Sequence, residues 1–462
     1  MSEPTGGARK NRHGRTAPAL LAVAGALLIL QQVLLWWLYY HYGAKQLVGD
    51  ETRYWSLAHE ILGGAAWHPS DTWPPAQPLF IALTLLVGGD SLLPVQIVQT
   101  LLFFGCGLLV FVVWRRISGN PLAAGIAAAL FVLAPSNAAY AQYLWPEVPH
   151  LFLVLAAFAL LLQVPVRTPA ALAAGVAVGV ALLFKSLLAA FWPLLLACFV
   201  VSWRPLRMNL HTAAAFVLAL AVTVAPALVA GHRNSGHWRI ADSSAINLLI
   251  GLRVPDRNDY IAWPGSNLFQ EYIASGADSD QRNAWAWSEI GAEVEETPLP
   301  ALVWRQLAKQ YFRLFESKTL LVGQLPGPAC AGYLGAYPDV PGWLALIVRW
   351  SSHLFHALIL AGFAFGLCMQ RSWRRLGLWL LLGFLGYQLA IYLGLLAIAR
   401  YLLPMMPVMC GFAGDAYARL AGADAGDGAS FTRLRLLAGS LLAALLLFLA
   451  FAAPWIDGYC RS

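Results

Sequence analysis

Charged residues are scarce in this chain of 462 residues: they make up 11% of it, whereas soluble globular proteins carry about 25%. Hydrophobic residues occupy 59% of the positions, and the mean hydropathy is +0.63. So few charges cannot cover a water-exposed surface of this size. The composition excludes a water-soluble protein and predicts an all-α polytopic membrane protein with most of its surface in the lipid bilayer.

Cysteines and blocks of basic residues are also few. The six cysteines are too scattered for a disulfide framework, and most lie in apolar runs where a thiol acts as a small hydrophobe. Cys330 and Cys460 both fall on the predicted outer side, where we hypothesise a disulfide between them. The net charge is only +7, and no basic block contains interleaved aromatic residues. We therefore expect no nucleic-acid partner.

Long apolar runs are abundant. The first extends over residues 18–40, follows a polar segment rather than a cleavable signal peptide, and is long enough to span a bilayer. Together with the later runs it predicts about 11 transmembrane helices. The later spans are 91–114, 119–135, 147–165, 169–184, 186–203, 210–230, 342–369, 376–398, 402–419 and 436–453.

The distribution of cations predicts the orientation. Four basic residues precede the first helix, which places the N-terminus in the cytoplasm by the positive-inside rule. With alternating spans, the predicted cytoplasmic loops carry arginines, whereas the short outer loops hold very few cations. Two outer segments are too long to be simple connections, namely 41–90 and 231–341. We expect three modules: 1–230, which contains the first outer loop, a periplasmic cap at 231–341, and the C-terminal helices at 342–462.

The first outer segment combines apolar and charged residues at helical spacing. Residues 49–64 predict an interfacial amphipathic helix that ends at glycine. Residues 73–83 are apolar but too short to span, and we place them flat on the outer surface. The segment 231–341 mixes acidic and basic residues with several tryptophans, which is typical of a small, mostly helical cap.

Asp50, Arg53 and Tyr54 share one stripe of the predicted interfacial helix, because residues three and four positions apart face the same side. A general base and an anion clamp at the membrane surface would have this composition. A structural alternative remains open, in which Asp50 only caps the helix and Arg53 extends to lipid headgroups.

Two isolated cations lie at predicted outer helix ends, Lys185 and Arg400. A charge at mid-membrane costs roughly 2.5–3.5 kcal/mol, so such a residue usually has a partner. If Arg53, Lys185 and Arg400 meet on one face, they would suit a phosphate group. Alternatively, Lys185 merely marks a turn.

Glu147 and His150 begin another predicted helix and face the same side of it. Glu-x-x-His can hold a divalent metal, but two ligands do not make a site. The alternative is a first-turn glutamate that interacts favourably with the helix dipole. The need for a metal cofactor stays open. His353 and His356 are interpreted as core or interface histidines and are not counted among the site residues.

Several motifs occur in a characteristic order. Asp-Glu-Thr-Arg-Tyr stands at 50–54, Pro-Pro-x-x-Pro-Leu at 74–79 and Arg-Tyr-x-Leu-Pro-x-x-Pro at 400–407, with a glutamate and a Leu-x-Lys between them. Together they resemble the C-type glycosyltransferases (GT-C) of family 39. That superfamily includes protein O-mannosyltransferases, aminoarabinose transferases that act on lipid A, and lipopolysaccharide sugar transferases of rhizobia.

The resemblance implies a GT-C fold and an inverting transfer of a sugar from a polyprenyl-phosphate donor to a lipid, glycan or protein hydroxyl of the cell envelope, on the outer side of the membrane. Asp50 would be the general base. Glu51, counted with Asp50 among the catalytic residues, and Glu147 would organise the acceptor or a metal, with His150 as a further candidate. The donor phosphate would be bound by Arg53, Tyr54, Lys185, Arg400 and Tyr401.

The chain departs from the family pattern at Thr72-Trp73, where aminoarabinose transferases carry Glu-Lys. This argues against aminoarabinose as the sugar. The chain also lacks room for the large lumenal insertion of eukaryotic protein O-mannosyltransferases, so we expect an enzyme of the bacterial inner membrane. Another polyprenyl-linked envelope enzyme, such as an O-antigen ligase or polymerase, is the alternative. A secondary transporter should show internal repeats, and we find none.

Overall fold

The computed structural model describes most of the chain, and its described residues are 6–42, 45, 47, 49–64, 73–163, 165–200, 206–253, 268–317, 342–370, 373, 375–422 and 433–456. Helices make up nearly all of these ranges, and no strand occurs within them. The predicted all-α fold class is confirmed. Thr72, Cys330 and Cys460 lie outside the described residues, so the hypothesised disulfide stays a prediction.

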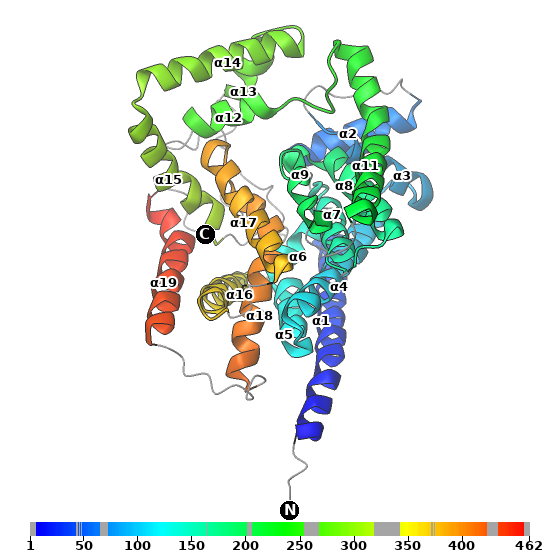
Figure 1. The fold of residues 1–462 in the computed structure, drawn as a ribbon. Helices are drawn as coiled ribbons and strands as arrows, with labels where there is room; N and C mark the ends of the chain where they lie inside the picture. Colours follow the sequence, from blue (N-terminus) through cyan, green and yellow to red (C-terminus); the bar gives the residue numbers. More distant parts are fainter. Residues whose placement is uncertain are drawn as a thin grey trace, which may run out of the picture.

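Long apolar helices form the frame of the molecule (Figure 1). Within the described ranges, six helices contain a segment long and apolar enough to cross a membrane. A seventh span arises if α5 (Pro121–Leu133) is joined to the bent continuation at 135–141, which turns by 62°. The six helices are α1 (Gly6–Tyr42), α4 (Leu92–Ser118), α11 (Leu206–Ser235), α16 (Gly342–Cys368), α17 (Leu376–Gly394) and α19 (Arg433–Ile456).

Fewer helices reach full spanning length than the sequence predicted, because several apolar helices are short. α7 (Glu147–Leu161), α8 (Thr168–Phe184) and α18 (Met406–Leu420) have 15, 17 and 15 residues. A charged residue lies next to one end of each helix: Glu147 begins α7, Lys185 follows α8, and Arg400 precedes α18. The expected helix at 186–203 is wrong as a continuous element: residues 186–200 form η2 (Ser186–Leu188), α9 (Trp192–Leu195) and α10 (Ala197–Val200).

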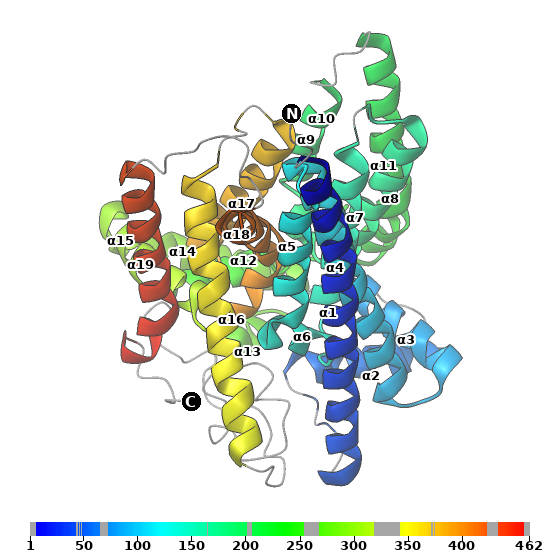
Figure 2. The ribbon, with the colours of Figure 1, turned by 90° about the horizontal axis from the view of Figure 1, so that it is seen from below.

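Small residues allow the central helices to approach closely. α5 packs against α1, α4 and α18, and α8 packs against α7 and α11 (Figure 2). A Cβ on Gly414 of α18 would lie 2.3 Å from the carbonyl oxygen of Ala123 on α5. A Cβ on Gly175 of α8 would lie 2.3 Å from the carbonyl oxygen of Phe216 on α11. Glycine therefore sets the spacing of both pairs, as in other membrane helix interfaces.

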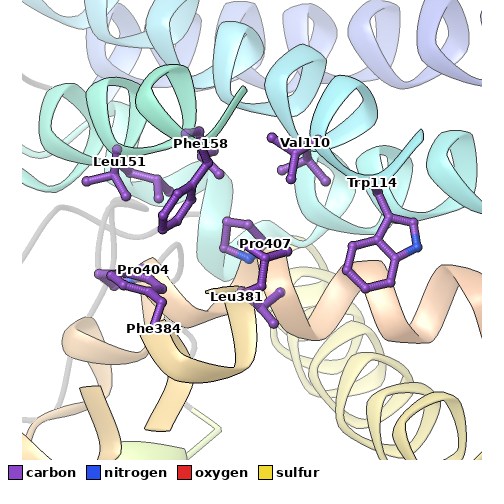
Figure 3. Close-up of a pocket in the computed structure, with 12 residues that line it drawn as sticks. Val110, Trp114, Leu151, Phe158, Leu381, Phe384, Pro404 and Pro407 are labelled. Carbon is purple, nitrogen blue, oxygen red and sulfur yellow. The ribbon is translucent and has the colours of Figure 1, made fainter. Parts of the chain in front are cut away.

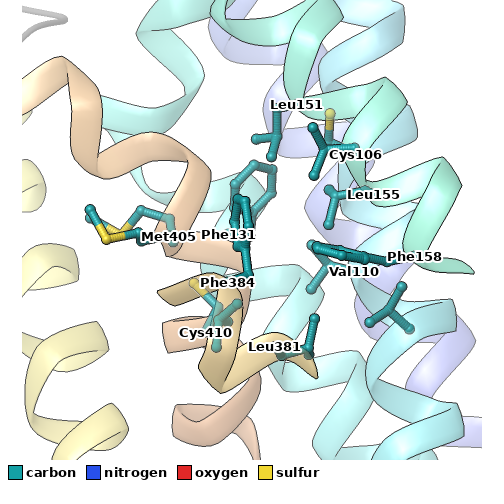
Figure 4. Close-up of a cluster of buried hydrophobic side chains, with 14 of the residues drawn as sticks. Cys106, Val110, Phe131, Leu151, Leu155, Phe158, Leu381, Phe384, Met405 and Cys410 are labelled. Carbon is teal, nitrogen blue, oxygen red and sulfur yellow. The ribbon is translucent and has the colours of Figure 1, made fainter. Parts of the chain in front are cut away.

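The main hydrophobic core joins the N-terminal and C-terminal helices. An apolar pocket within it lies between α4, α7, α17 and α18 and is lined by Val110, Leu151, Phe158, Leu381 and Pro407, among others (Figure 3). Around it, Phe158 and Phe384 pack edge to face with ring centroids 5.3 Å apart, and Phe131 lies close by (Figure 4). The core residues come from both ends of the chain, so these helices form one packed body.

The segment at 41–90, predicted to be outer, contains two helices, α2 (Asp50–Leu62) and α3 (Ala76–Gly88), which pack on each other. Their shared hydrophobic cluster includes Tyr54, Ala58, Ile81 and Leu144. The helix expected at 49–64 is therefore present, and it rests on the segment that leads into α7.

The described residues of the segment at 231–341 are mostly helical, as expected. It contains α12 (Ser244–Arg253), α13 (Leu268–Ala274), α14 (Ser279–Glu296) and α15 (Leu299–Phe315). A separate small hydrophobic cluster around Leu249, Tyr272 and Ala286 joins these helices. The cluster also includes Leu396, which lies shortly before the 3-10 helix η4 (Ala399–Met405).

Several arginines predicted to be cytoplasmic lie at one end of the helix bundle. Arg375 donates to the carbonyl oxygen of Ile117 at the end of α4, and Arg419 donates to that of Met369 over 2.7 Å. Arg400 lies beyond the opposite end of α18 from Arg419. The structure thus separates these arginines from the predicted site, as the alternation of spans requires.

Candidate active site

Four charged residues from four different elements meet at one place. Asp50 begins α2, Glu147 begins α7, Lys185 follows α8, and Arg400 lies in η4. Arg400 Nη2 is 2.9 Å from Asp50 Oδ2, and Lys185 Nζ is 3.1 Å from Glu147 Oε1. Arg400 Nε is 3.9 Å from the same Glu147 oxygen. The site cluster, as we call these four residues, has no formal net charge.

Aromatic rings hold the two cations in place. The guanidinium carbon of Arg400 lies 5.0 Å from the ring centroid of Trp145 and 5.2 Å from that of Tyr401. Lys185 Nζ lies 4.8 Å from the Tyr401 ring, and Tyr392 stacks on Tyr401 at 5.1 Å. Cation–π contacts orient a cation without neutralising it. The rings therefore leave the positive charge of both cations to their carboxylate partners and to an anionic ligand.

The site cluster also has unused hydrogen-bonding capacity. Glu147 Oε2 and Arg400 Nε are buried, and neither has a hydrogen-bond partner among the described residues. Buried polar atoms in proteins are almost always hydrogen-bonded, so an acceptor and a donor left open side by side indicate a place for a polar ligand or water.

Tyr54 lies beside the site cluster in α2. Its side chain is buried, and its ring meets that of Trp73 edge to face at 5.5 Å. Burial raises the pKa of the Tyr54 phenol, and the negative charges of Asp50 and Glu147 raise it further. The residue is therefore a neutral phenol at physiological pH and can donate a hydrogen bond.

Arg53 does not join the site cluster. Its side chain is half-exposed, and Nη1 lies 3.3 Å from Glu60 Oε1 on the same helix. The expectation that three cations meet on one face is therefore wrong for Arg53, because α2 turns this side chain outward. Arg400, which lies far away in the sequence, is the guanidinium that pairs with Asp50.

Glu51 points into the protein rather than toward Asp50. Its two carboxylate oxygens lie 2.6 Å and 2.8 Å from Lys45 Nζ, and Oε1 also accepts a hydrogen bond of 2.8 Å from the backbone N–H of Leu144. Glu51 and Lys45 are both buried. This geometry makes Glu51 a link between α2 and the segment before Glu147. Sequence reasoning did not single out Lys45.

His150 lies between α7 and α8. Its Nδ1 is 3.0 Å from the carbonyl oxygen of Ala181, which can only accept, so we assign the ring proton to Nδ1. Nε2 is buried without a partner among the described residues. Glu147 and His150 remain the candidate metal pair, but the described part of the chain holds no group of three or more His, Cys, Asp or Glu side chains arranged for a metal.

A set of buried glutamines holds the segment that leads into Glu147. The side-chain amides of Gln96, Gln99 and Gln77 donate to three successive backbone carbonyls, those of Gln142, Tyr143 and Leu144, over 3.4, 2.7 and 2.8 Å. Non-helical backbone at membrane depth needs such partners. Sequence reasoning missed these glutamines, although isolated amides within apolar helices are a usable signal.

The apolar pocket adjoins the site cluster along two elements. Leu151 lies about one turn after Glu147, and Pro404 lies about one turn after Arg400, and both line the pocket (Figure 3). The polar site cluster therefore lies next to an apolar pocket that is formed by the membrane helices.

Comparison with known proteins supports the family seen in the sequence. The family model for dolichyl-phosphate-mannose-protein mannosyltransferase matches residues 78–240, a range that includes Glu147 and Lys185. No curated protein sequence matches the chain. An independent family model thus supports the resemblance over residues 78–240.

A solved oligosaccharyltransferase structure shares the fold of this chain. The apo oligosaccharyltransferase of Archaeoglobus fulgidus superimposes with a TM-score of 0.51 at 14% identity, over 95% of this chain and 55% of that one. ArnT from Cupriavidus metallidurans bound to undecaprenyl phosphate gives a TM-score of 0.38 at 15% identity, over 86% of this chain and 79% of that one. This chain spans about half the length of the archaeal enzyme.

Proposed function

We propose that this chain, a membrane protein with the GT-C fold, is a glycosyltransferase that moves a sugar from a polyprenyl-phosphate donor to a hydroxyl group of an envelope lipid, glycan or protein. The match to a mannosyltransferase family model and the shared fold support this proposal. The observation that carries it is the site cluster, in which Asp50, Glu147, Lys185 and Arg400 converge from four elements.

The arrangement suits an inverting displacement at the anomeric carbon. The acceptor oxygen forms the new bond to this carbon while the bond from the carbon to the phosphate oxygen breaks, with its electron pair remaining on the phosphate. The acceptor proton passes to Asp50, whose side chain is 20% exposed and so open to an acceptor. The product polyprenyl phosphate leaves without a proton, because cations stabilise its charge.

Lys185 and Arg400 are the cations that would receive this phosphate. Tyr401 lies against both of them and keeps them on one side of the site. Arg400 has Nε without a partner among the described residues, so it can donate to a phosphate oxygen while Nη2 stays on Asp50. Charge-assisted hydrogen bonds of this kind are roughly twice as strong as neutral ones.

We place the site on the outer face of a bacterial cytoplasmic membrane. Two observations support this placement. The basic residues that precede the apolar run at 18–40, in the first turns of α1, favour a cytoplasmic N-terminus, and Arg375 and Arg419 lie at the end of the bundle away from Arg400.

The test compares envelope lipids and glycans, by mass spectrometry, from cells with and without the gene. We expect one sugar to be missing without the gene and restored by the wild-type chain. Asp50→Asn should not restore it, since the amide cannot accept the acceptor proton. Asp90→Asn is the matched control, because Asp90 is an exposed carboxylate that pairs with His59 away from the site cluster. Full restoration by Asp50→Asn would contradict the assigned base, and an unchanged sugar inventory would contradict the function.

A further inference from the structure

Helix α15 exposes apolar residues while it buries polar ones. Its buried side carries Gln306, Gln310 and Arg313 beside the apolar Leu302, Leu314 and Phe315, all at most 5% exposed. Its outward side carries Val303 and Trp304, and Trp304 is 71% exposed. A helix that packs on a protein from water carries polar and charged residues on its outward face instead.

The polar side of α15 cannot turn outward, because it is bonded to the protein. Gln306 and Gln310 both donate to the carbonyl oxygen of Gly251, over 2.9 and 2.8 Å. The side-chain oxygen of Gln310 accepts a hydrogen bond of 3.0 Å from the backbone N–H of Ala397, three residues before Arg400. These bonds set the rotation of α15 and commit its apolar side to the outside.

The neighbours of α15 are membrane helices. It packs against α17 and α19, and both views of the ribbon place it beside α19 (Figures 1 and 2). The rings of Phe312 on α15 and Phe448 on α19 meet at 5.4 Å, and Ser317 just after α15 donates to the carbonyl oxygen of Ala450. Leu441, like Phe448, is exposed on α19. The outward side of α15 therefore continues the apolar surface of a spanning helix.

We propose that α15 lies in the outer membrane interface, with a lipid-contact surface formed by Leu299, Val303, Trp304 and Leu307. The occupant of this surface is the acyl chain and headgroup boundary of the bilayer, where tryptophan is favoured. The segment at 231–341 is then not wholly a water-exposed cap. Its helix α15 is held by the membrane on one side and is hydrogen-bonded on the other to the backbone that precedes Arg400.

The experiment places a nitroxide spin label at Trp304→Cys and at Glu295→Cys in proteoliposomes of phosphatidylcholine and phosphatidylglycerol. Glu295 is an exposed residue of the polar helix α14 and serves as the water control. The signal of labelled protein with only its native cysteines is subtracted. We measure collision rates with oxygen, which concentrates in lipid, and with a water-soluble nickel chelate.

At position 304 we expect the ratio of oxygen to nickel collisions to be several times that at position 295. Equal ratios at the two positions would mean that α15 faces water and would overturn the proposal. A label at 304 that is shielded from both reagents would also overturn it, and spin–spin broadening would then identify a second copy of the chain as the occupant. Trp304→Phe and Trp304→Glu provide a second test. The first should keep the detergent-solubilised Tm and reconstitution yield of the wild type, whereas the second should lower only the reconstitution yield.

Discussion

Arg400 contacts a carboxylate and two aromatic rings at once, so few other side chains could replace it. Its guanidinium is planar, which matches both the Asp50 carboxylate and the faces of Trp145 and Tyr401. Lysine would keep the charge but not these contacts. Arg53, by contrast, carries the same group on the exposed side of α2.

This difference predicts unequal effects for two arginine variants. Arg400→Gln should lower kcat/KM for the polyprenyl-phosphate donor roughly 100-fold or more, because a donor to the leaving phosphate is lost. Arg53→Gln should change it by no more than about fivefold, since its exposed ion pair contributes about 1 kcal/mol or less. Donor-saturation kinetics in proteoliposomes measure both. A similar loss of kcat/KM in the two variants would indicate that Arg53 also binds the donor phosphate.

The adjacent acidic residues Asp50 and Glu51 of α2 have different roles in this structure. Measurements of thermal stability can distinguish these roles. Glu51→Gln removes the carboxylate that pairs with the buried Lys45, and breaking a buried ion pair costs about 3–5 kcal/mol. We therefore expect a clear drop in Tm for Glu51→Gln and little change for Asp50→Asn, measured by thermal unfolding in detergent. The double variant Lys45→Met with Glu51→Gln should recover part of the loss. If Glu51→Gln kept the wild-type Tm but lost activity, a direct catalytic role would be the better explanation.

At the scale of elements, the short helices explain how charged groups reach a membrane-embedded site. α7, α8 and η4 with α18 all break at the same end of the bundle, and their breaks carry Glu147, Lys185 and Arg400. Each break exposes backbone groups that need partners. The buried glutamines of α3 and α4 supply those partners for residues 142–144.

Removing one of these glutamine amides should displace the site residues, although the glutamine itself does not contact the site cluster. Gln99→Leu removes the amide hydrogen bond to the carbonyl of Tyr143, which contributes about 0.5–1.5 kcal/mol to stability. We expect lower kcat with a smaller effect on donor KM, because the displaced segment carries Trp145 and Glu147. Thr100→Val is the control, since its hydroxyl bonds only to Gln96 within α4. Equal activity of the two variants, each compared at matched stability, would contradict a positioning role for Gln99.

On the scale of the whole molecule, the helices form one core, with the site cluster at one end and Arg375 and Arg419 at the other. Because the chain crosses the bundle repeatedly, the sidedness of any loop determines that of all others. The outer position of the site therefore rests on the orientation of the entire molecule.

Cysteine labelling checks that orientation. Asp90→Cys, in the turn between α3 and α4, should react with a membrane-impermeant maleimide in spheroplasts. Ala421→Cys, just after α18, should react only in inverted vesicles or after permeabilisation. Both positions are exposed, so reactivity reports the side of the membrane. The reverse pattern would place the site in the cytoplasm and would contradict the outer-face assignment.

The sequence by itself determined the helical membrane fold, because apolar runs of this length have no other stable solution in a bilayer. It also pointed to Asp50, Glu147, Lys185 and Arg400, since isolated charges at apolar helix ends are costly and need a function. It left their partners open, because pairing depends on contacts between residues far apart in the chain.

Only the tertiary structure decided which way each side chain points. The packing of α2 on α3 and on the backbone of Leu144 turns Glu51 inward and Arg53 outward. The bonds from Gln306 and Gln310 to Gly251 set the rotation of α15. Sequence spacing shows which residues share one face of a helix, but the partner against which a helix packs determines whether that face meets lipid, water or the site.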